Sequence, residues 1–122
     1  MSILIVDDSP SMLMSVGMTL SATTLTVHKA ESGEAALATL QGGLKPAMML
    51  TDLNMGEMNG IELVRAVRKL PGYAFMPIVL LTTESSQDMR NLAKSAGATG
   101  WLTKPVEGEA LLTIVRKLVP AA

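Results

Sequence analysis

The chain has 122 residues, the size of one domain, and 48% of them are hydrophobic, enough for a core without disulfides or metal staples. Its formal net charge is −1 and its positive residues are scattered, so it lacks the basic footprint of a nucleic-acid binder. It has no cysteine, no signal-peptide core and no apolar run near the roughly 20 residues of a membrane span. We therefore expect a cytoplasmic location and no membrane insertion.

Short apolar runs alternate with segments of helical period along the whole chain. Apolar residues spaced i, i+3, i+4, i+7 predict five helices, and Ser9-Pro10 and Asn59 with Glu62 have the pattern of helix starts. The runs between helices predict strands at residues 3–6, 25–29, 47–51, 78–82 and 100–103. This alternation predicts a doubly wound α/β fold with a five-stranded parallel sheet, and we expect residues 1–122 to form a single domain.

Polar side chains stand where several of the predicted strands end. In an open α/β sheet, ligands bind beyond the carboxyl ends of the strands, at a switch in strand order. The residues that this rule selects are Asp7, Asp8, Asp52, Thr82, Thr83 and Lys104. They supply carboxylates for a cation together with a hydroxyl and an ammonium for an anion, and phosphoryl chemistry needs both kinds of group.

Three carboxylates brought together repel one another unless a cation or another partner balances them. Two like charges about 4 Å apart repel by roughly 4 kcal/mol at an effective dielectric constant near 20. Asp7, Asp8 and Asp52 offer hard oxygen ligands with few neutral partners, a set that suits Mg²⁺. We therefore expect a magnesium site. The alternative is that Asp7 and Asp8 serve only as turn and helix-cap residues. That alternative would leave Asp52 and Lys104, at the ends of other predicted strands, unexplained.

Six short motifs, in order and at matching spacing, resemble the receiver domains of two-component response regulators. They are Val6-Asp7-Asp8-Ser9, Asp52-Leu53-Asn54-Met55, Asn59-Gly60, Leu81-Thr82-Thr83-Glu84, Gly97-Ala98-Thr99-Gly100-Trp101 and Lys104-Pro105. The resemblance covers essentially the whole chain and is strongest to stand-alone CheY-like chemotaxis regulators. It implies a flavodoxin-like fold with strand order 2-1-3-4-5.

The resemblance assigns roles at the acidic site. It implies that Asp52 is the phosphoacceptor. Asp8 and Asp52 would ligate Mg²⁺ directly, together with the backbone carbonyl of Asn54, and Asp7 would act through water. This assignment agrees with the cation site expected from the residues themselves.

The resemblance also assigns the groups that read the phosphoryl group. Lys104 would pair with its oxygens, Thr82 would donate a hydrogen bond to it, and Trp101 would be the aromatic switch residue. The bond before Pro105 would be cis. Thr83 is the rival for the switch hydroxyl, and Trp101 as a plain core residue at the sheet edge remains an alternative.

The implied function is a signalling switch that a histidine kinase phosphorylates and a target protein reads. The target would bind the face formed by the fourth helix, the fifth strand and the fifth helix, and the flagellar motor switch is a candidate target. The protein would be a monomer that dephosphorylates itself, with Asn54 and Glu84 tuning that step, rather than a turnover enzyme; a phosphatase is a further candidate partner. A phosphorelay intermediate or phosphate sink remains an alternative within the family.

Two functions from other classes fit less well. A phosphatase with an aspartyl-phosphate intermediate needs a substrate-covering cap, for which 122 residues leave no room. A flavin-binding module needs a phosphate-binding loop after the first strand, where Asp7 and Asp8 would repel phosphate.

Four positions depart from the family's usual residues without removing a catalytic group: Gly56, Asn59, Thr83 and Val106.

Overall fold

The computed structural model describes residues 1–84 and 86–122, and within them five strands alternate with five helices, as the sequence predicts. In chain order the elements are β1 (Ser2–Val6), α1 (Pro10–Leu20), β2 (Thr26–Ala30), α2 (Gly33–Gln41), β3 (Met48–Asp52), α3 (Gly60–Lys69), β4 (Ile78–Thr82), α4 (Gln87–Ala96), β5 (Gly100–Thr103) and α5 (Gly108–Leu118).

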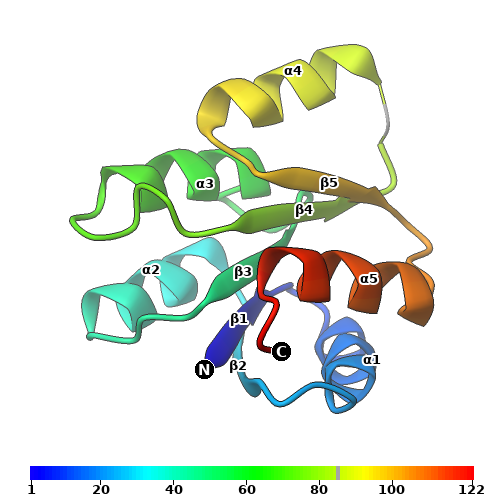
Figure 1. Cartoon of the computed structure of the whole chain (residues 1–122). Coiled ribbons are helices and arrows are strands. Elements are labelled where there is room, and N and C mark those ends of the chain that lie inside the picture. The colour runs from blue at the N-terminus through cyan, green and yellow to red at the C-terminus, as the bar shows by residue number, and fades with distance from the viewer. Residues whose placement is uncertain (85) are drawn as a thin grey trace.

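The strands run parallel in the order β2-β1-β3-β4-β5, which confirms the predicted doubly wound fold and strand order. Helices α2, α3 and α4 cover one face of the sheet, and α1 and α5 cover the other (Figure 1). None of the described helices is long and apolar enough to cross a membrane. The strand order reverses direction at β1 and β3, so this pair marks the switch point where a ligand site is expected.

Two strands were predicted one residue too early, and β1, predicted to cover 3–6, begins one residue earlier at Ser2. β2 covers 26–30 instead of 25–29, and β3 covers 48–52 instead of 47–51. Leu25 is buried in the core, but it precedes the ladder, in which Thr26 is the first residue opposite β1. At the other boundary Asp52 still pairs with Leu81 of β4, so the acidic residue is the last residue of its strand. The start of β2 was therefore misplaced because Leu25 is apolar and buried without being in the ladder, and the end of β3 was misplaced because Asp52 is polar but still pairs with β4.

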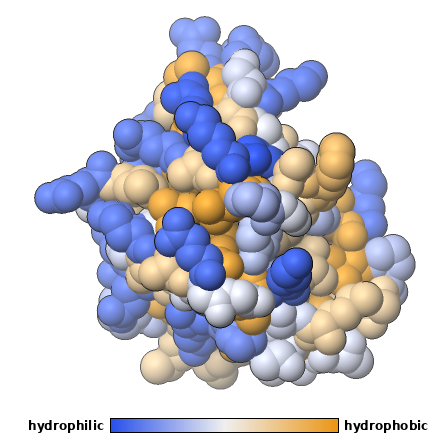
Figure 2. Space-filling model, turned by 90° about the vertical axis from the view of Figure 1, so that its left-hand side faces the viewer, coloured by the Kyte–Doolittle hydropathy of each residue, from blue (hydrophilic) through white to orange (hydrophobic). Residues whose placement is uncertain are grey.

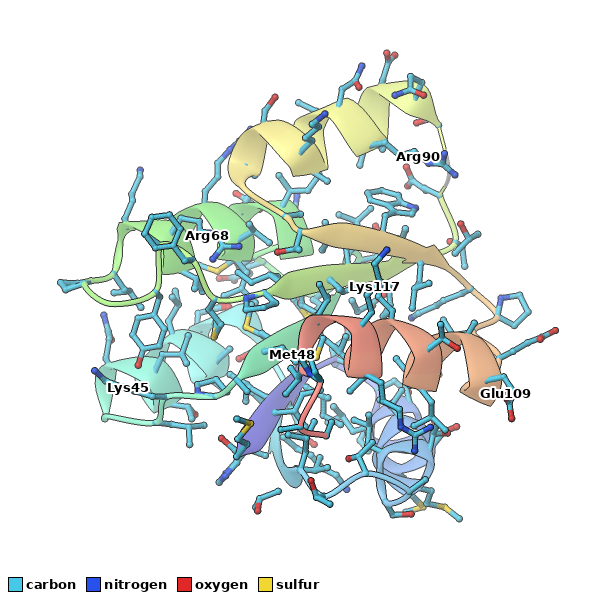
Figure 3. The ribbon with its side chains drawn as sticks, in the orientation of Figure 1. Lys45, Met48, Arg68, Arg90, Glu109 and Lys117 are labelled. Atoms are coloured by element: carbon cyan, nitrogen blue, oxygen red, sulfur yellow. The ribbon has the colours of Figure 1, made fainter. Side chains whose placement is uncertain are left out.

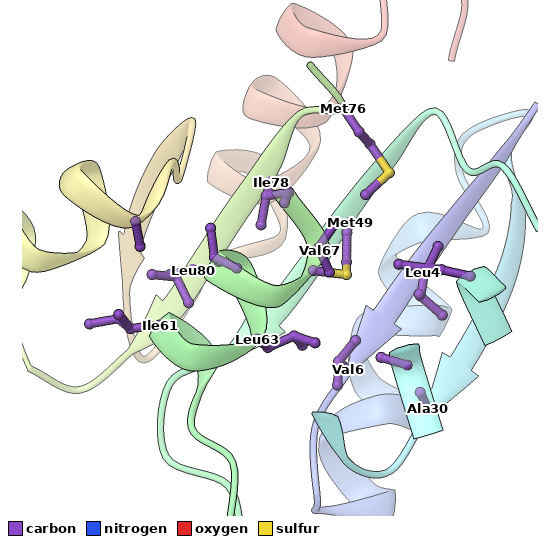
Figure 4. Close-up of a cluster of buried hydrophobic side chains, with 14 of the residues drawn as sticks. Leu4, Val6, Ala30, Met49, Ile61, Leu63, Val67, Met76, Ile78 and Leu80 are labelled. Carbon is purple, nitrogen blue, oxygen red and sulfur yellow. The ribbon is translucent and has the colours of Figure 1, made fainter. Parts of the chain in front are cut away.

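The core consists of two apolar layers, one on each face of the sheet. The first joins the sheet to α2, α3 and α4, and Figure 4 shows part of it, with Met49 from β3, Leu63 from α3 and Leu80 from β4 among its side chains. The second joins the sheet to α1 and α5. All residues of β3 and β4 are buried because both faces of these central strands are covered.

The helix starts were predicted correctly at two places that border the site. Ser9 caps α1, because its hydroxyl accepts a hydrogen bond from the Met12 amide at 3.3 Å. Asn59 and Glu62 form a capping box at the start of α3, with reciprocal bonds of 2.9 and 3.0 Å. The departure at Asn59 is therefore a change of cap residue that keeps the cap.

Gly60, the first residue of α3, lies against the end of β3. Its amide donates to the Leu53 carbonyl at 2.8 Å, and a Cβ here would collide with the Asp52 carbonyl oxygen and lie 2.7 Å from a methyl carbon of Leu80. We therefore expect Gly60→Ala to lower the free energy of unfolding by about 2 kcal/mol, through overpacking. Urea unfolding measures this. Gly56→Ala is the matched control, because nothing lies within 4 Å of a Cβ there; equal stabilities of the two variants would contradict the prediction.

Candidate functional site

The sheet brings the predicted site residues together at the carboxyl ends of its central strands. β1 leads into Asp7 and Asp8, the adjacent β3 ends at Asp52, and the next strand, β4, ends at Thr82. Lys104 follows β5, and its amide donates to the Thr82 carbonyl at 2.7 Å, which ties the end of β5 to the end of β4. Residues from four separate segments therefore meet at one edge of the sheet.

Three carboxylates form the acidic part of the site. One carboxylate oxygen from each of Asp7, Asp8 and Asp52 lies within 4.8 Å of the others. Asp7 and Asp52 are buried, whereas Asp8 is exposed to solvent. Hard, anionic oxygens at this spacing fit a divalent cation such as Mg²⁺, so the site can hold the metal expected from the sequence.

Lys104 supplies the positive charge of the site. Its Nζ lies 2.8 Å from Oδ1 of Asp52 and 3.6 Å from Oδ2 of Asp7. Burial by itself lowers the pKa of Lys104, but the hydrogen bond and the charge of Asp52 outweigh it, and the net pKa is raised. Lys104 is therefore an ammonium at neutral pH, in contact with the carboxylate that the resemblance identifies as the phosphoacceptor. The Lys104–Pro105 bond is cis, as expected.

Asp7 is held in place by its neighbour Ser9, whose amide donates to Oδ1 of Asp7 at 2.9 Å. Burial raises the pKa of Asp7, and the nearby Asp52 adds to the rise, against the opposing effects of the Ser9 amide and Lys104. A raised pKa means that Asp7 favours the folded state only at low pH. This contribution is lost as the pH rises through the raised value, so at neutral pH the charged side chain opposes folding.

We therefore expect Asp7→Asn to stabilise the metal-free protein by roughly 1 kcal/mol at pH 7, since the amide removes the buried charge and its oxygen can still accept from Ser9. Urea unfolding in EDTA measures this. The exposed Asp88 provides the control, because Asp88→Asn removes a favourable charge from the first turn of α4 and should cost a few tenths of a kcal/mol. A less stable Asp7→Asn protein in EDTA would contradict the argument.

Of the two candidate switch hydroxyls, Thr82 is the buried one. It is fully buried at the end of β4, and its Oγ1 accepts a hydrogen bond from the Glu84 amide at 3.0 Å. Thr83 is exposed and lines a hollow of about 470 Å³ beside Lys104. Burial next to the acidic site favours Thr82 as the group that responds to a charge on Asp52.

Trp101 lies in β5 opposite Leu80 of β4 and packs partly buried against the core layer of α2, α3 and α4. Its indole nitrogen is buried without a hydrogen-bond acceptor among the described residues. The ring also lines a hollow of about 380 Å³ between α4 and β5, together with Arg90 and Lys94. Trp101 is thus partly buried at the edge of the sheet, a position that suits both the switch role and the alternative of a core residue.

The remaining predicted positions lie around this site. Asn54 and Glu84 are exposed in the loops that follow β3 and β4. Gly56 is also exposed, and Val106 packs partly buried against the core layer of α1 and α5. None of the four residues that depart from the family pattern replaces Asp52 or Lys104.

Two contributors to the site were missed in the sequence. Ser9 was expected to cap a helix and was noted as part of a motif, but its amide also orients Asp7. Gly60 was noted only as part of a motif, but it lets α3 approach the backbone of Asp52. A glycine at the first position of a helix that follows an acidic loop was the available signal for a close backbone approach.

The fold and the site define a doubly wound α/β domain with an acidic centre and a lysine at its switch point. A family model described as "Response regulator receiver domain" matches residues 3–116. The chain therefore belongs to the response regulator receiver domain family, and is a CheY-like receiver of the kind found in two-component systems.

Relatives of two lengths match this chain. The Chemotaxis protein CheY1 of Helicobacter pylori is 35% identical over 112 residues, which cover 91% of this chain and 90% of that protein. The Transcriptional regulatory protein GlrR of Escherichia coli is 36% identical over 110 residues, which cover 89% of this chain but only 24% of GlrR. The chain thus spans about a quarter of that longer regulator.

Solved structures agree with this assignment. The chemotaxis protein CheY4 of Vibrio cholerae has a TM-score of 0.91 and 40% sequence identity, with 96% of this chain and 97% of that chain covered. A response regulator of Chloroflexus aurantiacus has a TM-score of 0.90 at 28% identity. Similarity of this extent confirms the CheY-like flavodoxin fold.

Proposed function

We propose that this protein is a phosphorylation-dependent signalling switch of a two-component system. Asp52 accepts a phosphoryl group from the phosphohistidine of a histidine kinase, and a target protein reads the result. The observation that carries the proposal is the contact of 2.8 Å between Lys104 Nζ and Asp52 Oδ1 beside two further carboxylates. A nucleophilic carboxylate, a cation-binding set and an ammonium in one place are the parts that phosphoryl transfer needs.

In the transfer step, a carboxylate oxygen of Asp52 attacks phosphorus while the bond between phosphorus and the histidine nitrogen breaks. The nitrogen keeps the bonding electron pair and takes up a proton, and an acyl phosphate forms on Asp52. Lys104 stabilises the negative charge on the phosphoryl oxygens. Asp8, Asp52 and the Asn54 carbonyl would hold Mg²⁺, with Asp7 acting through water, and the bound ion would neutralise charge on the same oxygens.

Signalling follows from the new charge of about −1.5 to −2 on Asp52. Thr82 moves to donate a hydrogen bond to the phosphoryl group and gives up the bond from the Glu84 amide. Trp101 then shifts into the vacated space, and the face of α4, β5 and α5 changes shape. That face is where a target binds. The names of the chemotaxis relatives support a chemotaxis partner, and our candidate for it is the flagellar motor switch.

The signal ends when water hydrolyses the acyl phosphate in the same site, with Asn54 and Glu84 beside the reacting groups setting its lifetime. In this proposal the protein is a cytoplasmic phosphoacceptor that is phosphorylated and then dephosphorylates itself, rather than an enzyme that turns over a separate substrate.

Incubation with acetyl phosphate and Mg²⁺, followed by intact-mass measurement, tests the proposal. The expected result is a gain of one phosphoryl group that EDTA prevents. No gain in mass, together with no Mg²⁺-dependent response to the phosphoryl mimic beryllofluoride, would overturn it and leave a receiver that acts by binding alone.

A further inference from the structure

The acidic residues of this chain all lie at one end of the sheet. Each of the eleven is the last residue of a strand, lies in the loop that follows a strand, or belongs to the first turn of the next helix. They are Asp7, Asp8, Glu31, Glu34, Asp52, Glu57, Glu62, Glu84, Asp88, Glu107 and Glu109. We call this end, defined by these residues, the carboxyl-end face; Asp52 and Lys104 lie within it.

Most basic residues lie toward the opposite end. Lys45 is in the loop before β3, and the last turns of helices hold Arg68, Lys69, Lys94, Arg116 and Lys117. Figure 3 shows Lys45 and Glu109 at opposite ends of the molecule, and Figure 2, which views the molecule from the Lys45 side, shows long hydrophilic side chains projecting there. The four other basic residues are exceptions: Lys104 lies in the carboxyl-end face, Lys29 is next to the last residue of β2, and Arg65 and Arg90 lie within α3 and α4. The small net charge therefore conceals a separation of charge along the strand direction.

The charge of the carboxyl-end face is not neutralised locally. Within the described part of the chain, both ion pairs closer than 4.0 Å are made by Lys104, with Asp7 and Asp52. The exposed carboxylates have no such partner there. Each helix N-terminus at this end offsets about half an elementary charge, so five of them leave the face strongly negative. A field of this kind acts over roughly 10 Å at 0.1 M salt.

The phosphoryl group that must reach Asp52 is itself an anion. An anionic carrier meets repulsion as it approaches the carboxyl-end face, whereas a carrier with positive groups around the phosphoryl group is attracted to it. The one positive group at the centre, Lys104, is already paired with Asp52 and cannot attract a distant donor alone.

We infer that the carboxyl-end face selects phosphodonors by charge, favouring a phosphohistidine on a cationic protein surface over anionic donors. The inference rests on the proposed function and adds the chemistry of the partner to it. The selection acts on the rate of encounter, through charges that do not touch the reacting atoms.

Two phosphohistidine peptides test this inference. They are identical except that lysines flank the histidine in one and glutamates flank it in the other. With the 122-residue chain and saturating Mg²⁺ at low salt, we expect transfer from the lysine peptide to be faster by about tenfold, within the range known for electrostatic steering. The ratio should fall toward one as salt is added.

Charge-matched variants locate the effect. Glu31→Gln with Glu107→Gln removes two exposed charges from the carboxyl-end face, and neither side chain makes a hydrogen bond in the described structure. Gln41→Lys with Ala74→Lys changes the net charge equally at the opposite end, at exposed positions. The first pair should reduce the peptide rate ratio, and the second should preserve it.

Three outcomes would overturn the inference. Equal rates for the two peptides, a ratio insensitive to salt, or equal effects of the two variant pairs would each show that position-dependent charge does not select the donor. In all three, phosphorylation by acetyl phosphate would still support the proposed function. Failure of acetyl phosphate and of both peptides would overturn the proposed function and this inference with it.

Discussion

Replacing Asp52 by asparagine is expected to lower the rate of phosphoryl uptake from acetyl phosphate by more than about a thousandfold. The amide is nearly the same size as the carboxylate, but its oxygen is a poor nucleophile and carries no charge to hold a cation. It also weakens the contact of 2.8 Å to Lys104, since the partner loses its negative charge. Intact-mass measurement over time, in the presence of Mg²⁺, gives the rate directly.

The control for this variant is Asp88→Asn, which changes an exposed aspartate in the first turn of α4. It should take up the phosphoryl group at the rate of the unchanged protein or slightly faster, because it removes one negative charge from the carboxyl-end face and none of the reacting groups. Lys104→Met is a graded comparison, because it removes a charge-stabilising donor and leaves the nucleophile, and we expect a loss of roughly a hundredfold. Phosphorylation of Asp52→Asn at the normal rate would mean that another residue accepts the group.

The second large effect is expected at Arg68, a half-buried residue of α3 far from the acidic site in sequence. Its guanidinium donates to the Gly97 carbonyl through Nε at 3.0 Å and Nη2 at 2.8 Å, and to the Tyr73 and Met76 carbonyls through Nη1 at 2.8 and 2.6 Å. It thus joins the end of α3, the loop before β4 and the end of α4. Arg68→Met leaves three carbonyls without this donor, and we expect a loss of about 3 kcal/mol in the free energy of unfolding.

Arg65→Met is the matched control, since Arg65 is exposed on the same helix, three residues earlier. It should change stability by less than about 0.5 kcal/mol. Urea unfolding of both variants gives the comparison, and thermal unfolding should show Arg68→Met melting roughly 10 °C lower. A loss at Arg68 no larger than the loss at Arg65 would show that water replaces the guanidinium at these carbonyls.

The sequence predicted the layers of the fold and the centre of the site because both follow from local patterns. Apolar runs ending in Asp7 and Asp52 marked β1 and β3, and the rule for parallel sheets placed their ends side by side. The same rule placed Lys104 at the site, because this residue follows the last strand along the chain. The strand order itself came from resemblance, because alternation alone does not determine how parallel strands are arranged.

What the sequence did not reveal depends on contacts between distant segments. Arg68 reads as one of several charged residues on an amphipathic helix, and only the fold brings Gly97 to its guanidinium. Nor does the sequence predict that the Trp101 indole nitrogen is buried without an acceptor in the described structure, since that depends on how β5 packs beside α4. The boundary of β3 belongs to the same group, because pairing with β4 carries Asp52 into the strand.

The central claim is that a charge on Asp52 changes the face that contains Trp101. Trp101 is the only tryptophan, so its indole N–H gives a single signal in a ¹⁵N-resolved NMR spectrum. We predict that Mg²⁺ and beryllofluoride move this signal in the unchanged protein and leave it in place in Asp52→Asn. An indole signal that stays fixed while the amides beside Asp52 shift would contradict the account, because the site would then bind the phosphoryl mimic without reaching the face of α4, β5 and α5.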